Sequence, residues 1–188
     1  MIGNASAPHI AVPDGLPGMA GLMAYKPSLG SRIQAFAQEL LRGPSPLSPG
    51  ERELIAAFVS SRNECYFCAH LHTGVAAYLL DSDRDAVCTV IADVDTAPVS
   101  DKLRALLTIA AKVANSGRDV TSADIAGARA AGAEDEDIHD AVLVAAAFCM
   151  FNRYVDGLRA ITPRDDAVYD RIGRVRADDG YLSSPTRR

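Results

Sequence analysis

The sequence has no excess of basic residues and no long apolar run. Its 188 residues include 19 lysines and arginines against 24 aspartates and glutamates, a formal net charge of -5. A chain without a basic stripe lacks the charge that neutralises phosphates, so we expect no nucleic-acid partner. No segment approaches the roughly 18 consecutive apolar residues that span a bilayer, so we expect no membrane partner either.

The N-terminal segment lacks the features of a secretory signal. Residues 1–13 contain neither a basic region nor a long apolar stretch. We therefore expect a cytoplasmic protein, in a reducing compartment where a Cys-x-x-Cys motif is more often catalytic, redox-active or metal-binding than structural. Of the four cysteines, Cys88 and Cys149 stand alone in apolar surroundings, and we expect both to be small buried hydrophobic residues.

The sequence also lacks any sustained alternation of apolar and polar residues, so β-strands are not expected. Helix signals are frequent instead, and the predicted fold class is all-α. Ser48, Pro49 and Glu51 predict a capping box for a helix that runs to about Ser61. The other predicted helices begin at Ser28 (to about Leu41), at Glu64 after a cap at Asn63 (to about Leu80), near Val87, after Ser100, after Thr121 and after the acidic residues 134–137.

Changes in composition divide the chain into an irregular N-terminal arm (1–17), a helical domain (18–160) and a C-terminal extension (161–188). The extension is expected to form a short helix to Val175 and then a tail, a candidate arm around a neighbouring subunit. Within the domain, residues 47–80 and 120–155 both resemble a capped helix followed by a more apolar one. A duplicated helical hairpin is one interpretation of this pattern. The many apolar residues of 141–151 indicate a central helix or a subunit interface.

Reactive side chains gather at Cys65-Tyr66-Phe67-Cys68 and His72. Thiols spaced i, i+3 on a helix can form a disulfide or share a metal ion, and a residue four positions later lies on the same helix face. Glu53 adds a carboxylate from the preceding helix. Because a thiolate is the nucleophile, the helix N-terminus favours Cys65 as the more acidic thiol, whereas the nearby His72 favours Cys68. The sequence leaves that choice open.

A redox pair is favoured over the two alternatives, a zinc site and two chance buried cysteines. Cys65, Cys68 and His72 would supply three zinc ligands, with His70 as a spare, but a structural zinc site usually takes four ligands from two separated pairs. No second pair is present, and we expect no metal and no cofactor. His70 is expected at a surface or interface, and His139 is expected to be exposed.

The pattern Glu53-x11-Cys65-x2-Cys68-x3-His72 resembles the alkylhydroperoxidase D (AhpD)-like branch of the carboxymuconolactone decarboxylase superfamily. Residues 47–55, 60–65 and 151–158 resemble its peroxidase-related subgroup. The resemblance covers about residues 18–160. It implies an AhpD-like helical bundle that assembles as a homo-oligomer, a trimer or a hexamer.

The resemblance also implies a thiol-dependent peroxidase of the peroxiredoxin type, acting on alkyl hydroperoxides or hydrogen peroxide. Cys68 would attack the peroxide, Cys65 would resolve the sulfenic acid to a disulfide, and Glu53 and His72 would relay protons. A thiol or lipoyl-type reductant would restore the thiols. AhpD-type members carry a histidine where this chain has Phe67, so the alternative is a redox or zinc-binding sensor, or a disulfide reductase, without efficient turnover. The decarboxylase branch lacks the Cys-x-x-Cys motif, so lactone decarboxylation is not expected.

Overall fold

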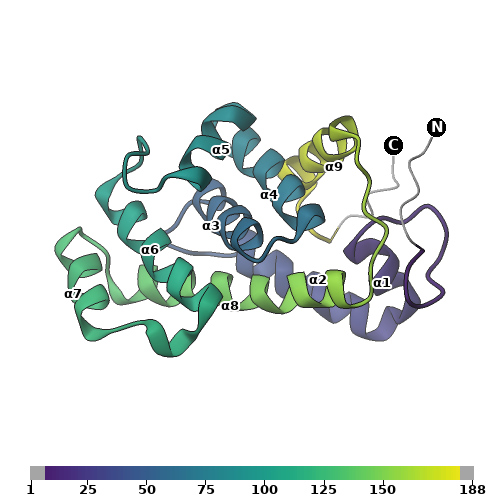
Figure 1. Ribbon diagram of the computed structural model, residues 1–188, viewed down its shortest axis with the longest axis horizontal. Helices are drawn as coiled ribbons and strands as arrows, with labels where there is room; N and C mark the ends of the chain where they lie inside the picture. The colour runs from purple at the N-terminus through teal and green to yellow at the C-terminus, as the bar shows by residue number, and fades with distance from the viewer. Residues whose placement is uncertain (1–6, 183–188) are drawn as a thin grey trace.

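The computed structural model describes residues 7–182, which form an elongated bundle of helices without a β-strand (Figure 1). The predicted all-α class is confirmed. The helices in chain order are α1 (Met19–Tyr25), α2 (Pro27–Arg42), α3 (Pro49–Arg62), α4 (Tyr66–Leu79), α5 (Arg84–Ala92), α6 (Asp101–Asn115), the 3-10 helix η1 (Gly117–Asp119), α7 (Ser122–Ala130), α8 (Asp135–Gly157) and α9 (Asp166–Asp179).

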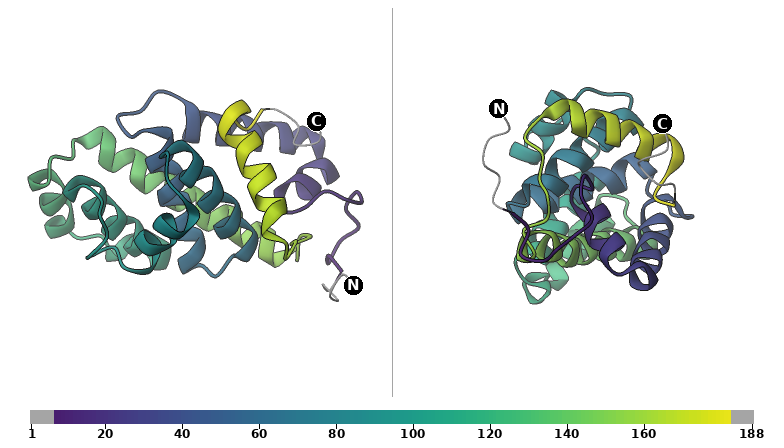
Figure 2. Two further views of the ribbon diagram at one scale, coloured as in Figure 1. Left: turned by 90° about the horizontal axis from the view of Figure 1, so that it is seen from above. Right: turned by 90° about the vertical axis from the view of Figure 1, so that its right-hand side faces the viewer.

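The antiparallel pair α3 and α4 lies at the centre of the bundle. All residues of α3 from Arg52 to Ser60 are buried, because α4, α6 and α8 all pack against it. Helix α9 covers the outer face of α4 (Figures 1 and 2). The two helices approach closely at Gly74 and Gly173, where a Cβ on Gly173 would lie 3.4 Å from the Gly74 carbonyl carbon. Polar side chains on α3 and α4 are therefore held inside the core.

Helix α8 runs along one side of the bundle and contacts α2, α3 and α6 (Figure 1). Within residues 7–182 it is the one helix long and apolar enough, by length and composition alone, to cross a membrane. The core helix of a globular protein passes the same test, and Val144, Ala145 and Phe148 of α8 are fully packed in the hydrophobic core. The apolar residues of 141–151 thus lie partly in the core, while Leu143 and Met150 on the same helix are exposed, so the choice between a central helix and a subunit interface remains a prediction.

Most predicted helix starts coincide with observed caps. Ser48 and Glu51 form the predicted capping box of α3, Ser100 caps α6, and Thr121 with Asp124 caps α7. Each cap is formed by side chains within three residues of the backbone they bind, which is why local sequence was sufficient to predict them.

Two predicted helix starts were wrong. Helix α2 begins at Pro27, before Ser28, because proline is preorganised for the first helical position. Helix α4 begins at Tyr66 rather than Glu64, which has a left-handed φ of 58°. Asn63 does not cap α4; it ends α3, and its side-chain amide donates to Asn152 Oδ1 at 2.9 Å. Cys65 is therefore the N-cap residue of α4, and Cys68 is its third helical residue.

The prediction for the isolated cysteines was wrong for Cys88, which is exposed, and only partly right for Cys149, which is half-buried. Helix α5 is short and buries only Val87 and Val90. Cys88, which follows Val87 directly, therefore faces solvent. His139 is exposed, as predicted, and lies 2.9 Å from the carboxylate of its neighbour Asp140.

Residues 7–17 of the N-terminal arm contain no helix, and residues 1–6 lie outside the described part.

The C-terminal extension packs on its own chain. Helix α9 extends to Asp179, beyond the predicted end at Val175, and rests on α4 rather than reaching away toward a neighbouring subunit. The tail from residue 183 lies outside the described residues. The boundary between the helical domain and the C-terminal extension, at residues 160 and 161, remains a prediction. Helix α9 of the extension packs directly against α4 of the domain.

Candidate active site

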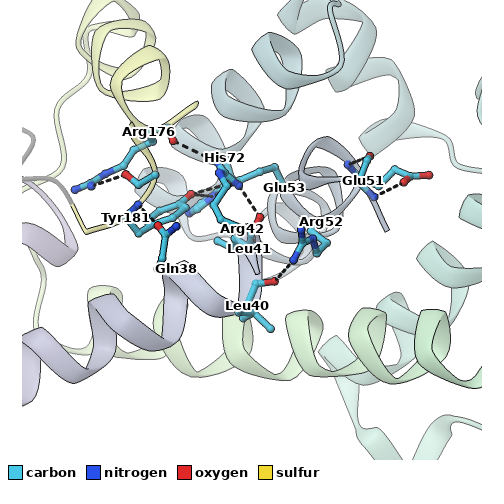
Figure 3. A network of polar contacts seen from close by, with 12 residues as sticks. Gln38, Leu40, Leu41, Arg42, Glu51, Arg52, Glu53, His72, Arg176 and Tyr181 are labelled. Carbon is cyan, nitrogen blue, oxygen red and sulfur yellow. Dashed lines mark hydrogen bonds and ion pairs between the residues drawn. The ribbon is translucent and has the colours of Figure 1, made fainter. Parts of the chain in front are cut away.

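Glu53 is the centre of a buried polar network. Its side chain has no solvent exposure. One carboxylate oxygen, Oε2, lies 2.6 Å from Nδ1 of His72. The other, Oε1, accepts hydrogen bonds from the Tyr181 hydroxyl and the Arg42 guanidinium, each at 2.7 Å. Figure 3 shows these side chains converging from α2, α3, α4 and the segment after α9. The carboxylate that the sequence places on the helix before the thiol pair is thus completely buried.

The network keeps Glu53 ionised despite its burial. Burial raises the pKa of the Glu53 carboxyl, but His72, Arg42 and the Tyr181 hydroxyl together lower that pKa below its ordinary value. The pKa of the Tyr181 phenol is raised well above its ordinary value by burial and by the adjacent Glu53 carboxylate, so this hydroxyl keeps its proton and donates it to the hydrogen bond. A buried carboxylate with charged and neutral donors on both oxygens is a stable feature at neutral pH.

Tyr181 is held in place by both its backbone and its ring. Its backbone N–H donates to Gln38 Oε1 at 2.7 Å. Its ring lies between two guanidinium groups, with Arg42 Cζ 5.3 Å and Arg176 Cζ 5.4 Å from the ring centroid. The preceding Gly180 has a φ of 70°, and a Cβ there would lie 2.4 Å from the same Gln38 oxygen. Only glycine fits this turn without strain.

The Glu53 carboxylate determines how His72 is protonated. An ionised carboxylate is only an acceptor, so Nδ1 of His72 must carry the proton that it shares with Glu53. In the neutral ring Nε2 then has a free lone pair, and it makes no hydrogen bond within the described chain. The ring also contacts Phe148 edge-on at 4.5 Å. His72 is therefore oriented with its basic nitrogen away from Glu53, an arrangement suited to proton transfer.

The two cysteines are both free thiols, but their surroundings differ. Cys68 lines a cavity of about 390 Å³ together with His72, which lies one helical turn away on the same face of α4; Cys65 does not line it. A hydrogen bond to Cys68 and burial raise the pKa of the Cys65 thiol far above its ordinary value. Cys65 thus stays protonated next to Cys68.

Asp156 is a further acidic residue beside the thiol pair. Burial raises the pKa of its carboxyl, and a hydrogen bond from Cys65 opposes that rise. The neighbouring Asn152 of α8 donates to Ser60 Oγ at 3.0 Å and accepts from Asn63. The segments 60–65 and 151–158, which carried part of the resemblance, therefore meet at the start of α4.

Phe67 and His70 do not provide a proton relay. Phe67 is buried, contacts the ring of Tyr169 at 5.7 Å and fills the space beside Gly18, where a Cβ would lie 2.0 Å from the Phe67 ring. It forms an apolar wall of the cavity. His70 stacks on Tyr66 at 3.7 Å and lies outside the cavity, so it does not replace the histidine that Phe67 displaces.

The structure thus brings together all four predicted site residues: Glu53 bonds His72, His72 and Cys68 share the cavity, and Cys65 contacts Cys68. Sequence reasoning missed Arg42 and Tyr181. No local motif surrounds either residue, and Tyr181 lies 128 positions from Glu53. Within residues 7–182, no three side chains of the ligand types His, Cys, Asp and Glu lie close enough to hold a metal ion.

A family model described as the carboxymuconolactone decarboxylase family matches the chain twice, over residues 27–85 and 85–163. The two matches agree with a duplicated helical unit. No curated protein matches the sequence.

Two solved structures share the fold. An uncharacterized peroxidase-related protein from Silicibacter sp. TM1040 is 27% identical, with a TM-score of 0.75 over 87% of this chain and 94% of that one. A second peroxidase-related protein, from Ralstonia eutropha JMP134 and described as an alkylhydroperoxidase AhpD core, is 25% identical, with a TM-score of 0.74 over 85% of this chain and 82% of that one. This chain is thus similar in fold to AhpD-like proteins.

Proposed function

The chain belongs to the carboxymuconolactone decarboxylase family, and on that premise we propose that it is a thiol-dependent peroxidase that uses Cys68 and Cys65 as a redox pair. The observation that carries the proposal is the asymmetry of the thiols. Cys68 lines the cavity beside His72, whereas Cys65 lies behind it and holds its proton. The two peroxidase-related structures support the same activity class.

In the first step the Cys68 thiolate attacks the terminal oxygen of a hydroperoxide. A sulfur–oxygen bond forms, the oxygen–oxygen bond breaks, and the alkoxide leaves as an alcohol after taking a proton. Cys68 becomes a sulfenic acid. In the second step the Cys65 sulfur attacks Cys68, a disulfide forms and water leaves. The peroxide is reduced by two electrons, and the thiol pair is oxidised by two.

The proton transfers fall to His72, which Glu53 orients. Nε2 of His72 is the free base that accepts the Cys68 proton, and the resulting imidazolium donates it to the leaving alkoxide. The ionised Glu53 stabilises that imidazolium through the 2.6 Å contact with Nδ1. Arg42 and Tyr181 are positioning residues, because they hold the carboxylate without touching the cavity-facing nitrogen.

Turnover requires a reductant, and the family resemblance implies a homo-oligomer. We propose that a dithiol, of the lipoyl or a similar class, reduces the Cys65–Cys68 disulfide by thiol exchange. Exposed Leu143 and Met150, seven residues apart on α8, support a subunit contact on that helix. Light scattering of the purified protein tests the assembly, and a monomer would contradict it.

The test of the proposed function is peroxide consumption by the reduced protein. Wild-type protein with excess dithiothreitol should consume cumene hydroperoxide catalytically, and Cys68→Ser should abolish this. Cys65→Ser, reduced and then freed of dithiothreitol, should allow one turnover and accumulate a sulfenic acid that a dimedone probe labels at Cys68. Cys88→Ser is the matched control, because that thiol is exposed on α5 and does not line the cavity.

Full retention of turnover in Cys68→Ser would refute the proposal. Rapid disulfide formation without catalytic peroxide consumption would favour a disulfide reductase or a redox sensor. Metal measurement on protein purified without added metal provides an independent comparison, since stoichiometric zinc that shields both thiols from alkylation would favour a zinc-binding sensor.

A further inference from the structure

The cavity beside Cys68 is larger than hydrogen peroxide needs. Its volume of about 390 Å³ falls in the range of pockets that enclose an organic ligand, about 300–1,000 Å³. Its walls are mainly apolar and come from the N-terminal segment and from α1, α2, α4, α8 and α9; examples are Met19, Met23, Ile33, Phe151 and Ile172. A substrate with a hydrocarbon body would bury apolar surface along these walls.

The cavity lining contains basic residues but no carboxylate. Among residues 7–182 it includes His72, Arg171 and Arg176, with Cys68 and Tyr181 as its other titratable groups and no aspartate or glutamate. This is notable for a chain with a net charge of -5. The Glu53 carboxylate lies behind His72 and does not line the cavity. The charge in the cavity therefore favours an anionic ligand.

The exposure of the lining residues shows how the cavity is oriented. Cys68 is only 2% exposed and His72 6%, so they lie at its inner end. Arg171 and Gly15 are the exposed residues of the lining, so they lie at the end open to solvent. On α9, residues Val168, Arg171 and Ile172 share the face that lines the cavity, as their i, i+3 and i+4 spacing requires.

Arg171 is available for a ligand. Its guanidinium makes no hydrogen bond or ion pair with any described residue, whereas the neighbouring Asp170 pairs with Arg84 at 3.1 Å. Arg176 is buried and donates to the Gly180 carbonyl, so it contributes positive potential at the inner wall rather than a free donor.

From this arrangement, and resting on the proposed function, we propose that the substrate is an amphipathic hydroperoxide acid, such as a medium-chain fatty-acid hydroperoxide. Its peroxide group reaches Cys68 and His72 at the inner end, its hydrocarbon chain follows the apolar walls, and its carboxylate pairs with Arg171 at the mouth.

The test compares a medium-chain fatty-acid hydroperoxide with its methyl ester, which has the same peroxide and chain but no charge. We expect kcat/KM to be about three- to fivefold higher for the acid, the effect of one partly exposed charge pair. Arg171→Gln should bring the ratio close to one. Arg174→Gln is the matched control, because Arg174 is an exposed arginine on the same helix that does not line the cavity.

A second measurement does not depend on turnover. The parent fatty acid, below its micelle concentration, should slow the alkylation of Cys68 by iodoacetamide more than its methyl ester does, as followed by peptide mass spectrometry. Exposed Cys88 in the same molecule provides the internal reference and should react equally in all samples. Arg171→Gln should remove the difference between acid and ester, and calorimetric titration with the same pair should give the same ranking.

The outcomes separate the two proposals. Equal reduction of acid and ester, equal protection by both, or a preference that survives Arg171→Gln would overturn the substrate class while the peroxidase function stands. Selective protection of Cys68 by the acid, without reduction of any hydroperoxide, would support the ligand class and overturn the peroxidase function.

Discussion

The hydroxyl of Tyr181 should contribute more to stability than that of a comparable buried tyrosine. Tyr181→Phe removes a 2.7 Å hydrogen bond to the ionised, fully buried Glu53. Hydrogen bonds to charged groups contribute about 1.5–3 kcal/mol, and the phenylalanine ring still fits between the two guanidinium groups, so we expect a loss of about that size in the free energy of unfolding.

The matched control is Tyr169→Phe. Tyr169 is also fully buried, but its hydroxyl donates to the neutral carbonyl of Pro163, again at 2.7 Å. A hydrogen bond between neutral groups contributes about 0.5–1.5 kcal/mol. Urea unfolding of both variants and the wild type gives the two losses in unfolding free energy. Equal slopes of that free energy against urea concentration would confirm that all three proteins expose the same surface on unfolding.

The pH dependence distinguishes a charge-assisted bond from simple packing. The stability that the ionised Glu53 contributes is present at neutral pH and is lost as pH falls below about 4.3, its unfolded-state pKa, through the lower folded pKa. The difference in the free energy of unfolding between wild type and Tyr181→Phe should therefore become smaller in acid. The difference between wild type and Tyr169→Phe should not change. A loss in Tyr181→Phe no greater than in the control, or a gap independent of pH, would refute the view that the C-terminal segment stabilises the active-site carboxylate.

Three further predictions follow from the same contacts. Gly180→Ala should destabilise the protein by about 1–3 kcal/mol, since alanine is strained at a φ of 70° and its Cβ would meet the Gln38 oxygen, whereas Gly127→Ala, on an open face of α7, should stabilise it by about 0.5–1 kcal/mol in the same urea assay. Glu53→Gln should cost about 3–5 kcal/mol at pH 7, because it breaks a buried ion pair, and less below about pH 4.3; an equal cost at both pH values would contradict the ionised state. Cys65→Ser should leave the first, stoichiometric peroxide reduction within about threefold of wild type in stopped-flow measurements while preventing further cycles, and a larger loss would show that Cys65 takes part in the attack itself.

Local signals were sufficient for most of the fold. The caps at Ser48, Ser100 and Thr121 bind backbone groups three residues away, so the residues around each helix start were sufficient to predict it. The errors arose where a distant contact or a backbone preference intervened. Asn63 bonds Asn152 of α8 rather than capping α4, and the solvent side of α5 could not be recognised from the apolar neighbours of Cys88.

The sequence by itself determined the all-helical fold and the grouping of two thiols, an imidazole and an acid, because these depend on residue type and on spacings of a few positions. The tertiary structure decided which thiol faces the cavity, that Glu53 is buried and ionised, and that Tyr181 lies against it. Those facts depend on how α9 crosses α4 and on which side of α4 remains open. Both the crossing of α9 over α4 and the open side of α4 are set by packing between elements far apart along the chain. The spacing of residues within one helix carries no information about such packing.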